Sequence, residues 1–214
     1  MKLIYIMDAY CGWCYGNSEN LQRLTEHYEG QLELEILPAG MWSGENARRQ
    51  TPQLARFIKS HDEQVAARTG TAFSAVYFHT LNDTDRILDS EVPARAIVAT
   101  QDKWPALALD FTAAVQHARF VEGKDLNNED TYRNIAEKLG IPVDTFLEHF
   151  HSNEMKMLTL QTFAEASAYA HSYPTLLLQK ENMLYTIENG YSAFPQLVDA
   201  IDKRLHEAFD IHLN

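Results

Sequence analysis

The two cysteines of the chain, Cys11 and Cys14, stand three positions apart with Gly12 and Trp13 between them. On a helix, side chains at this spacing lie on one face, so the two sulfurs are close enough to bridge. A disulfide across two residues closes almost no loop and therefore stabilises a fold little. The pair is better suited to reversible thiol–disulfide chemistry than to a structural role.

The position of the pair along the chain predicts different roles for the two thiols. Helical spacing of Leu21, Leu24 and Tyr28 places the cysteines at or just before the first turn of a helix, where exposed N–H groups stabilise a thiolate. We expect the outer thiol, Cys11, to be the nucleophile and Cys14, one turn deeper, to be the resolving thiol. Because Gly12-Trp13 adds no positive charge, we expect a reduction potential between that of a reductant and that of a strong oxidant.

Tyr173-Pro174-Thr175 forms the second chemical element, directly before the apolar run of residues 175–179. In a thioredoxin-type fold the proline before this strand has a cis peptide bond and faces the cysteine pair, which leaves the preceding backbone free to pair with an extended substrate. We therefore predict a cis Pro174 in the catalytic site. The alternative is an ordinary trans proline at the start of a strand. Trp13, Tyr173 and Thr175 are the candidate substrate-binding residues.

The elements that must position these residues begin and end the chain. The apolar run 2–7 predicts a buried strand, followed by the helix of Leu21 to Tyr28 and an alternating strand at 31–37. At the other end, 175–179 and 183–188 predict a hairpin around a turn at 180–182, and a helix follows from Phe194 to Leu205. The order β-α-β, helices, β-β-α predicts an α/β fold: a thioredoxin-like domain of residues 1–40 and 171–214 with a large all-helical insertion of residues 41–170.

Apolar residues at helical intervals fill the predicted insertion, and no strand is expected there. We interpret these stripes as core rather than as ligand-binding faces. The stripes comprise Leu54, Phe57, Ile58 and Val65; Leu107, Phe111, Ala114, Val115 and Ala118; Tyr132, Ile135, Ala136 and Leu139 after a cap at Asn127 or Asn128; Val143, Phe146, Leu147 and Phe150; and a last helix over 153–170.

Composition excludes several kinds of partner. The formal net charge is −12 and the pI about 5.1, with no Lys/Arg cluster to offset it, so neither nucleic acid nor an anionic membrane surface is expected to bind. The apolar start is short and meets Asp8, unlike a signal peptide, and no apolar run reaches membrane-spanning length. We expect a cytoplasmic protein. A mature form whose signal has been removed is the alternative.

No metal site is expected from the histidines. A zinc site at the cysteines would need two further ligands. His149 and His151 are near each other in sequence, but neither they nor His171 have the ligand spacing of a structural zinc site. We interpret most histidines as solvated surface residues and single out His171 only for its nearness to Pro174.

The segments Asp8-Ala-Tyr-Cys11-Gly-Trp-Cys14-Tyr-Gly16 and Ser172-Tyr-Pro174-Thr-Leu-Leu-Leu178 resemble the DsbA-like thioredoxin superfamily, especially its FrnE-like cytosolic branch. The resemblance implies a helical domain covering one side of the active site, a nucleophilic Cys11, a resolving Cys14 and a cis Pro174. It also implies a protein disulfide oxidoreductase or isomerase whose partners are protein thiols, protein disulfides or glutathione. No cofactor beyond the redox-active disulfide is expected, with glutathione as a candidate reductant. Periplasmic oxidants of the superfamily carry a His between the cysteines, where this chain has Gly-Trp.

Two alternatives remain open at this stage. The same branch is similar in fold to kappa-class glutathione transferases and hydroxychromene carboxylate isomerases, which have Ser where Cys11 stands; Met41, Trp42 and the helical insertion could then form a small-ligand pocket. The third hypothesis is a non-catalytic module that binds partner proteins through an apolar patch of Trp13, Tyr15 and Trp42.

Overall fold

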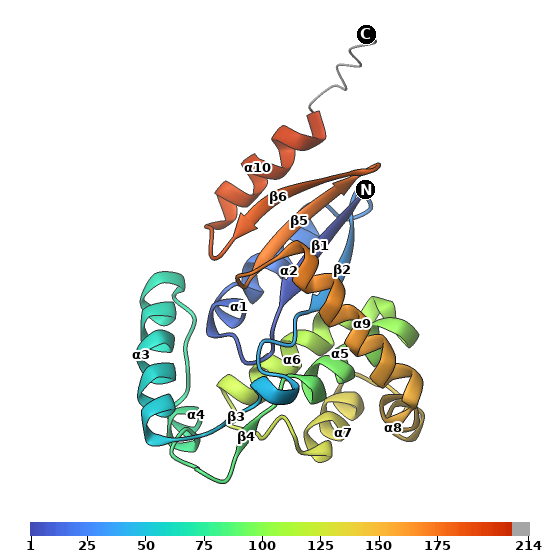
Figure 1. The fold of residues 1–214 in the computed structure, drawn as a ribbon. Helices are drawn as coiled ribbons and strands as arrows, with labels where there is room; N and C mark the ends of the chain where they lie inside the picture. Colours follow the sequence, from blue (N-terminus) through green and yellow to red (C-terminus); the bar gives the residue numbers. More distant parts are fainter. Residues whose placement is uncertain (207–214) are drawn as a thin grey trace.

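The computed structural model describes residues 1–206; residues 207–214, the end of the predicted thioredoxin-like segment, lie outside the described residues. A four-stranded mixed sheet has the order β2-β1-β5-β6, in which β1 is parallel to β2 and antiparallel to β5, and β5 is antiparallel to β6 (Figure 1). This is the predicted thioredoxin-like topology. Its elements are β1 (Lys2–Met7), α1 (Gly12–Gly16), α2 (Ser18–His27), β2 (Glu33–Pro38), β5 (Thr175–Lys180), β6 (Met183–Asn189) and α10 (Phe194–His206).

The insertion between β2 and β5 is mainly helical, as predicted. It contains η1 (Gly44–Asn46), β3 (Arg48–Arg49), α3 (Pro52–Thr69), α4 (Ala75–Thr80), β4 (Ile87–Leu88), α5 (Glu91–Lys103), η2 (Pro105–Leu107), α6 (Ala108–Phe120), α7 (Glu129–Lys138), α8 (Val143–His151) and α9 (Asn153–Tyr169). The division into domains at residues 40 and 170 stays a prediction.

The expectation that no strand occurs in the insertion is wrong, because β3 and β4 form a small antiparallel ladder. Two residues are too few to show the alternation by which strands are recognised. The ladder is extended by Gln50, whose backbone N–H donates to Arg86 O at 2.9 Å and whose side-chain amide donates to the carbonyls of Thr80 and Asp83. These contacts, distant in sequence, form the ladder.

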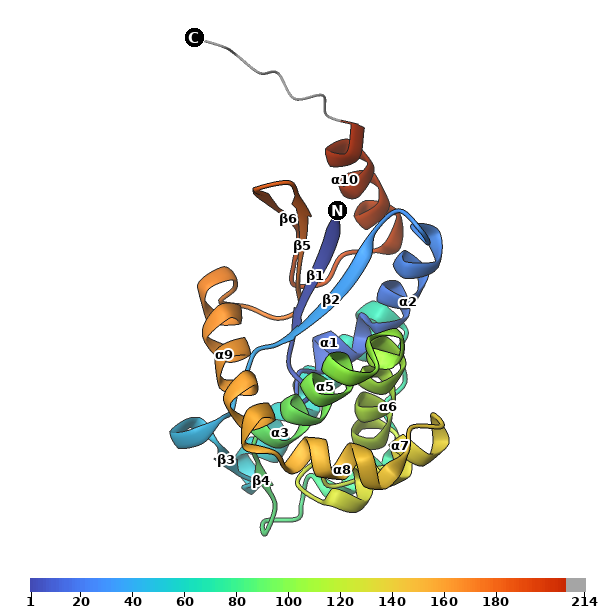
Figure 2. The same ribbon diagram turned by 90° about the vertical axis from the view of Figure 1, so that its right-hand side faces the viewer.

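Alternation along the strands of the main sheet directs side chains to two different layers. Ile4, Ile6, Leu37 and Leu177 pack with Ala166 of α9. The opposite face carries Leu3, Tyr5, Met7, Ile36, Leu176 and Leu178, which join the large core shared with the remaining helices. Figure 2 shows α9 on one side of the sheet and α2 and α10 on the other. The sheet is therefore covered on both faces, and its edge near the end of β1 opens toward the insertion.

Local boundaries differ from the predictions in several places, among them β2, which begins at Glu33 and ends at Pro38 instead of spanning 31–37. The first helix is interrupted at Asn17, which separates α1 from α2. The hairpin turn is only Glu181-Asn182, with Glu181 in the left-handed region at a φ of 56°. Helix α5 had no periodic signal because Pro93 through Thr100 are all buried, so no polar face marks it. Within residues 1–206 no helix is long and apolar enough to cross a bilayer.

Candidate active site

Cys11 occupies the turn between β1 and α1 and is the N-cap residue of α1. Its backbone is extended, with φ −81° and ψ 110°, so the sulfur turns back over the first helical turn and accepts a hydrogen bond from Cys14 N at 3.2 Å. The Cys11 thiol also donates to Tyr173 O at 3.6 Å. An N–H donor aimed at the sulfur favours the thiolate form of a cysteine. The structure thus gives Cys11 a direct stabilising donor.

Cys14 lies one turn further into α1 and is fully buried. Burial raises the pKa of the Cys14 thiol well above its usual value, and the nearby Cys11 sulfur raises it further. Both cysteines are free thiols. Cys14 is therefore protonated at neutral pH and shielded from bulk reagents, whereas Cys11 lines an open pocket.

The loop before β5 brings the second predicted motif to the cysteines. The Tyr173–Pro174 peptide bond is cis, which confirms the predicted isomer. Thr175 is buried and its hydroxyl donates to Ser172 O at 2.9 Å, so this side chain holds the loop and does not line the pocket. Its predicted contact with substrate is not supported by this position.

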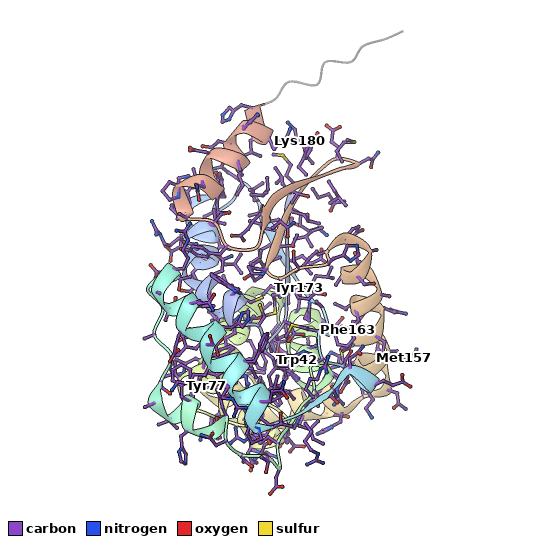
Figure 3. All side chains as sticks on the ribbon, turned by 60° about the vertical axis from the view of Figure 1, so that its left-hand side comes forward. Trp42, Tyr77, Met157, Phe163, Tyr173 and Lys180 are labelled. Carbon is purple, nitrogen blue, oxygen red and sulfur yellow. The ribbon has the colours of Figure 1, made fainter. Side chains whose placement is uncertain are left out.

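A pocket of about 370 Å³ opens beside Cys11. Besides Cys11 it is lined by Tyr10, Gly12, Trp13, Met41, Trp42, Phe57, Ile58, His61, Asp62, Val65, His171, Ser172 and Tyr173. Figure 3 shows Trp42 and Tyr173 in the middle of the molecule, between α3 and α9. The pocket thus combines the cysteine motif, the proline loop and the insertion.

Several aromatic residues differ from their predicted positions. Phe57 is 55% exposed and lines the pocket, so its assignment to the core was wrong. The Tyr15 ring stacks on Phe120 with 4.8 Å between the ring centres, and it packs edge-on against Phe73 with 5.2 Å between the ring centres. Tyr15 does not line the pocket. The predicted patch of Trp13, Tyr15 and Trp42 therefore does not form as a unit, although both tryptophans line the pocket.

Asp62 of α3 is a site residue that the sequence analysis missed. The side chain is buried, Oδ2 accepts a 2.7 Å hydrogen bond from the Tyr77 hydroxyl, and Oδ1 lies 2.1 Å from the position that a β-carbon on Gly12 would take. Burial raises the pKa of Asp62 to about 6, while the Tyr77 hydroxyl and the Arg119 charge oppose this. The sequence did contain a signal for Asp62, because this acid falls between Ile58 and Val65 in the apolar stripe of a predicted helix.

Asp8 connects the cysteine turn to the insertion. Its carboxylate accepts hydrogen bonds from Tyr10 N at 2.9 Å and from Met41 N at 2.7 Å, which positions one wall of the pocket. Burial raises the pKa of Asp8, and Arg119 opposes that rise. Arg119 is itself buried, with its guanidinium 4.5 Å from the Tyr10 ring centre. The charge of Arg119 therefore lowers the pKa of Asp8, which follows β1, and of Asp62, which belongs to α3 in the insertion.

Two other groups of charged residues lie outside the pocket. His149 contacts Asp102 at 2.9 Å and His151 contacts Glu129 at 2.6 Å; across residues 1–206 no group of three or more His, Cys, Asp or Glu side chains is arranged to hold a metal ion. Arg48 and Arg49 are exposed and line a second hollow together with Trp42 and Phe57. This pair of positive charges lies beside the two aromatic residues shared by the two hollows, and it leaves the net negative charge of the chain unbalanced.

Comparison with known proteins agrees with this arrangement. The profile of the DsbA-like thioredoxin domain matches residues 2–201, so the chain belongs to the DsbA-like thioredoxin family. A search of curated protein sequences found no match. The similarity to individual proteins comes instead from solved structures.

Three such structures bear on function. A crystal structure from Nitrosomonas europaea, whose protein is provisionally described as a protein disulfide isomerase, has a TM-score of 0.87 and 27% identity, covering 96% of this chain and 98% of that one. The cytosolic disulfide reductase DsbM of Pseudomonas aeruginosa has a TM-score of 0.82 and 25% identity, covering 97% and 100%. A 2-hydroxychromene-2-carboxylate isomerase, at 16% identity and a TM-score of 0.65, shares the fold.

Proposed function

We propose that the protein is a thiol–disulfide oxidoreductase that exchanges disulfides through Cys11 and Cys14. The observation that carries the proposal is the position of the Cys11 sulfur, 3.2 Å from the Cys14 N–H and 3.6 Å from the Tyr173 carbonyl, on the wall of an open pocket. A nucleophilic thiolate needs a stabilising donor and access to its substrate. Cys11 has both.

The proposed reaction has two exchange steps. The Cys11 thiolate attacks one sulfur of a substrate disulfide, forms a mixed disulfide and releases the other sulfur as a thiolate, which takes up a proton. Cys14 then loses its proton and attacks the Cys11 sulfur, which forms the Cys11–Cys14 disulfide and releases the second substrate thiolate. The substrate gains two electrons and the protein loses two. Reduction of the protein by two thiols completes the cycle.

The Pro174 loop supplies main-chain groups beside the mixed disulfide. The Tyr173 carbonyl is already within hydrogen-bonding distance of Cys11, so an extended substrate attached to Cys11 would lie along this backbone. Trp13 and the Tyr173 side chain line the same pocket. We assign these two residues, with the loop backbone, to substrate binding.

Net reduction of substrates, with glutathione as the electron donor, is the direction we propose. The similarity to a cytosolic disulfide reductase, whose structure was also solved with glutathione, supports this direction and a cytoplasmic location. The acidic surface is in keeping with protein or small-thiol partners rather than nucleic acid.

The experiment that tests the proposal is reduction of a protein disulfide such as that of insulin, with glutathione and a coupled glutathione reductase. We expect Cys11→Ser to abolish turnover and Cys14→Ser to trap the mixed disulfide and lower turnover strongly. Unchanged turnover in Cys11→Ser would refute the proposal.

A glutathione-dependent transferase or isomerase is the second candidate, because the pocket beside Cys11 has the size of a small-ligand site. That chemistry needs no resolving thiol. Glutathione-dependent conversion of a small aromatic substrate that survives Cys14→Ser, without disulfide reduction, would favour it over disulfide exchange.

A further inference from the structure

We propose that Asp62 Oδ1 is a recognition acceptor for the substrate, and that the preferred disulfides carry an ammonium group close to the reacting sulfur. The inference deepens the proposed disulfide exchange and rests on it. Its basis is the contact between an acid of the insertion and the cysteine motif itself.

The two oxygens of Asp62 have different surroundings. Oδ2 is taken by the Tyr77 hydroxyl at 2.7 Å. Oδ1 lies against Gly12, and the side-chain hydrogen bond of Asp62 within residues 1–206 is made by Oδ2. The whole residue is only 4% exposed, but Oδ1 is not among the fully buried atoms that lack a partner, so a ligand in the pocket can reach it. A carboxylate in a residue this poorly exposed is incompletely solvated, so a further hydrogen-bond donor stabilises it. Since Asp62 lines the pocket with Cys11, a donor on a bound substrate can satisfy this oxygen.

The charges around the pocket favour a cationic donor. Among the described residues 1–206, no lysine or arginine lines it, and Asp62 is its one acid. The Arg119 guanidinium carbon lies 4.5 Å from the ring centre of Tyr10 and 5.3 Å from that of Tyr77. Its positive charge interacts with the carboxylates of both Asp8 and Asp62. The chain as a whole carries a formal charge of −12. A positively charged substrate is thus attracted both at long range and at the site.

The walls of the pocket suit the same ligand. Trp13, Trp42, Phe57 and Tyr173 present aromatic side chains to the space beside Cys11. Aromatic faces attract ammonium groups, most strongly where water is partly excluded. A carboxylate acceptor surrounded by aromatic rings therefore points to an alkylammonium rather than to a carboxylate arm.

The titratable groups that face Asp62 come from several elements. They are Tyr77 of α4, Arg119 of α6, Cys11 before α1, His61 of α3, and Tyr10, Tyr173 and His171 across the pocket. Because the pKa of Asp62 is about 6, it is ionised at pH 7.5 and mostly protonated at pH 5. His61 and His171 line the same pocket, so His61→Gln and His171→Gln variants are needed beside the Asp62 variant.

The test compares three small disulfides of similar length: cystamine, bis(2-hydroxyethyl) disulfide and 3,3′-dithiodipropionate. Second-order rates for oxidation of the reduced full-length protein are divided by the rates for a reference thiol, which removes intrinsic differences between the disulfides. At pH 7.5 we expect this corrected rate for cystamine to exceed that for the hydroxyethyl compound by about tenfold, the effect of one charge-assisted hydrogen bond. Asp62→Asn should remove this preference, and the matched control Glu63→Gln on the same helix should keep it.

The pH dependence gives an independent readout. The cystamine preference should fall as the pH drops through about 6 in the wild type and in both histidine variants. Tyr77→Phe removes a hydrogen bond that lowers the pKa of Asp62, so the midpoint should move to higher pH. A merely structural role of Asp62 would change all three disulfides alike and would not move a midpoint.

The contrary outcomes are distinct. If the hydroxyethyl compound reacts through Cys11 but cystamine is not preferred, or if Asp62→Asn leaves the preference intact, the recognition role is refuted while disulfide exchange stands. Preference for dithiodipropionate would also refute it and would point to Arg48 and Arg49. If none of the disulfides reacts, or Cys11→Ser reacts as fast as the wild type, the proposed function fails together with this inference.

Discussion

Asn17 Nδ2 donates a 2.8 Å hydrogen bond to Glu188 Oε2, which joins the interruption between α1 and α2 to the last strand of the sheet. The other carboxylate oxygen of Glu188 accepts from Ser192 N at 2.8 Å. Glu188 is 2% exposed, and burial raises its pKa to about 7 despite these two donors. A buried acid whose pKa is raised to about 7 thus contacts the junction between α1 and α2, just after the two cysteines.

The raised pKa of Glu188 predicts a pH-dependent stability. Because the folded protein holds this proton up to about pH 7, whereas the unfolded chain releases it near its ordinary pKa, the free energy of unfolding falls as the pH rises between these values. The loss is at most about 3 kcal/mol. We measure the free energy of unfolding by urea at pH 5 and pH 8. In Glu188→Gln the decrease between these two pH values should be smaller than in the wild type by this amount. An equal slope in wild type and variant, with the exposed control Glu29→Gln also unchanged, would contradict it.

The different burial of the two thiols predicts selective alkylation. Cys11 lines the pocket, whereas Cys14 is fully buried and burial raises its pKa well above the usual value. Iodoacetamide at pH 7 should therefore modify Cys11 of the reduced native protein at least about tenfold faster than Cys14. Peptide mass spectrometry measures both rates, and unfolding in urea should abolish the difference. Comparable native rates would show that Cys14 is not shielded.

The contact between Gly12 and Asp62 predicts a steric cost for any side chain at position 12. A β-carbon there would lie 2.1 Å from Asp62 Oδ1 and 3.2 Å from its carboxyl carbon. Gly12→Ala should lower the free energy of unfolding by about 1–3 kcal/mol, as overpacking does. Combination with Asp62→Ala should recover most of that loss in a double-mutant cycle. If the two effects simply add, the residues are not in contact.

We expect removal of the buried Arg119 to lower the free energy of unfolding further, by an amount that depends on pH. Arg119→Leu leaves Asp8 and Asp62 without the charge that lowers both of their pKa values. The cost should be about 3–5 kcal/mol at pH 8 and smaller at pH 5, where protonation of Asp62 relieves the uncompensated charge. Thermal or urea unfolding at both pH values measures this, with the charge-conserving Arg119→Lys as control. A loss that is independent of pH would indicate packing alone.

Local patterns in the sequence determined most of the strands and the proline loop that position the two cysteines. Short apolar runs predicted the four main strands, because a strand pattern depends on neighbouring residues. The cis peptide bond of Pro174 was predicted from its position before a strand together with the cysteine pair at the start of the chain. The spacing of Cys11 and Cys14 determined the chemistry to be expected. Helix α5 escaped detection because burial on all sides removes the periodic signal.

Only the tertiary structure decided what surrounds the cysteines. Asp62 meets Gly12, 50 residues earlier in the chain, and Asp8 accepts from Met41 N, because the insertion packs across the end of β1. Such contacts join residues that share no local pattern, and they place a buried aspartate of a helix in the same pocket as Cys11. A sequence shows which side chains can react, whereas their burial and partners come from the packing of distant segments.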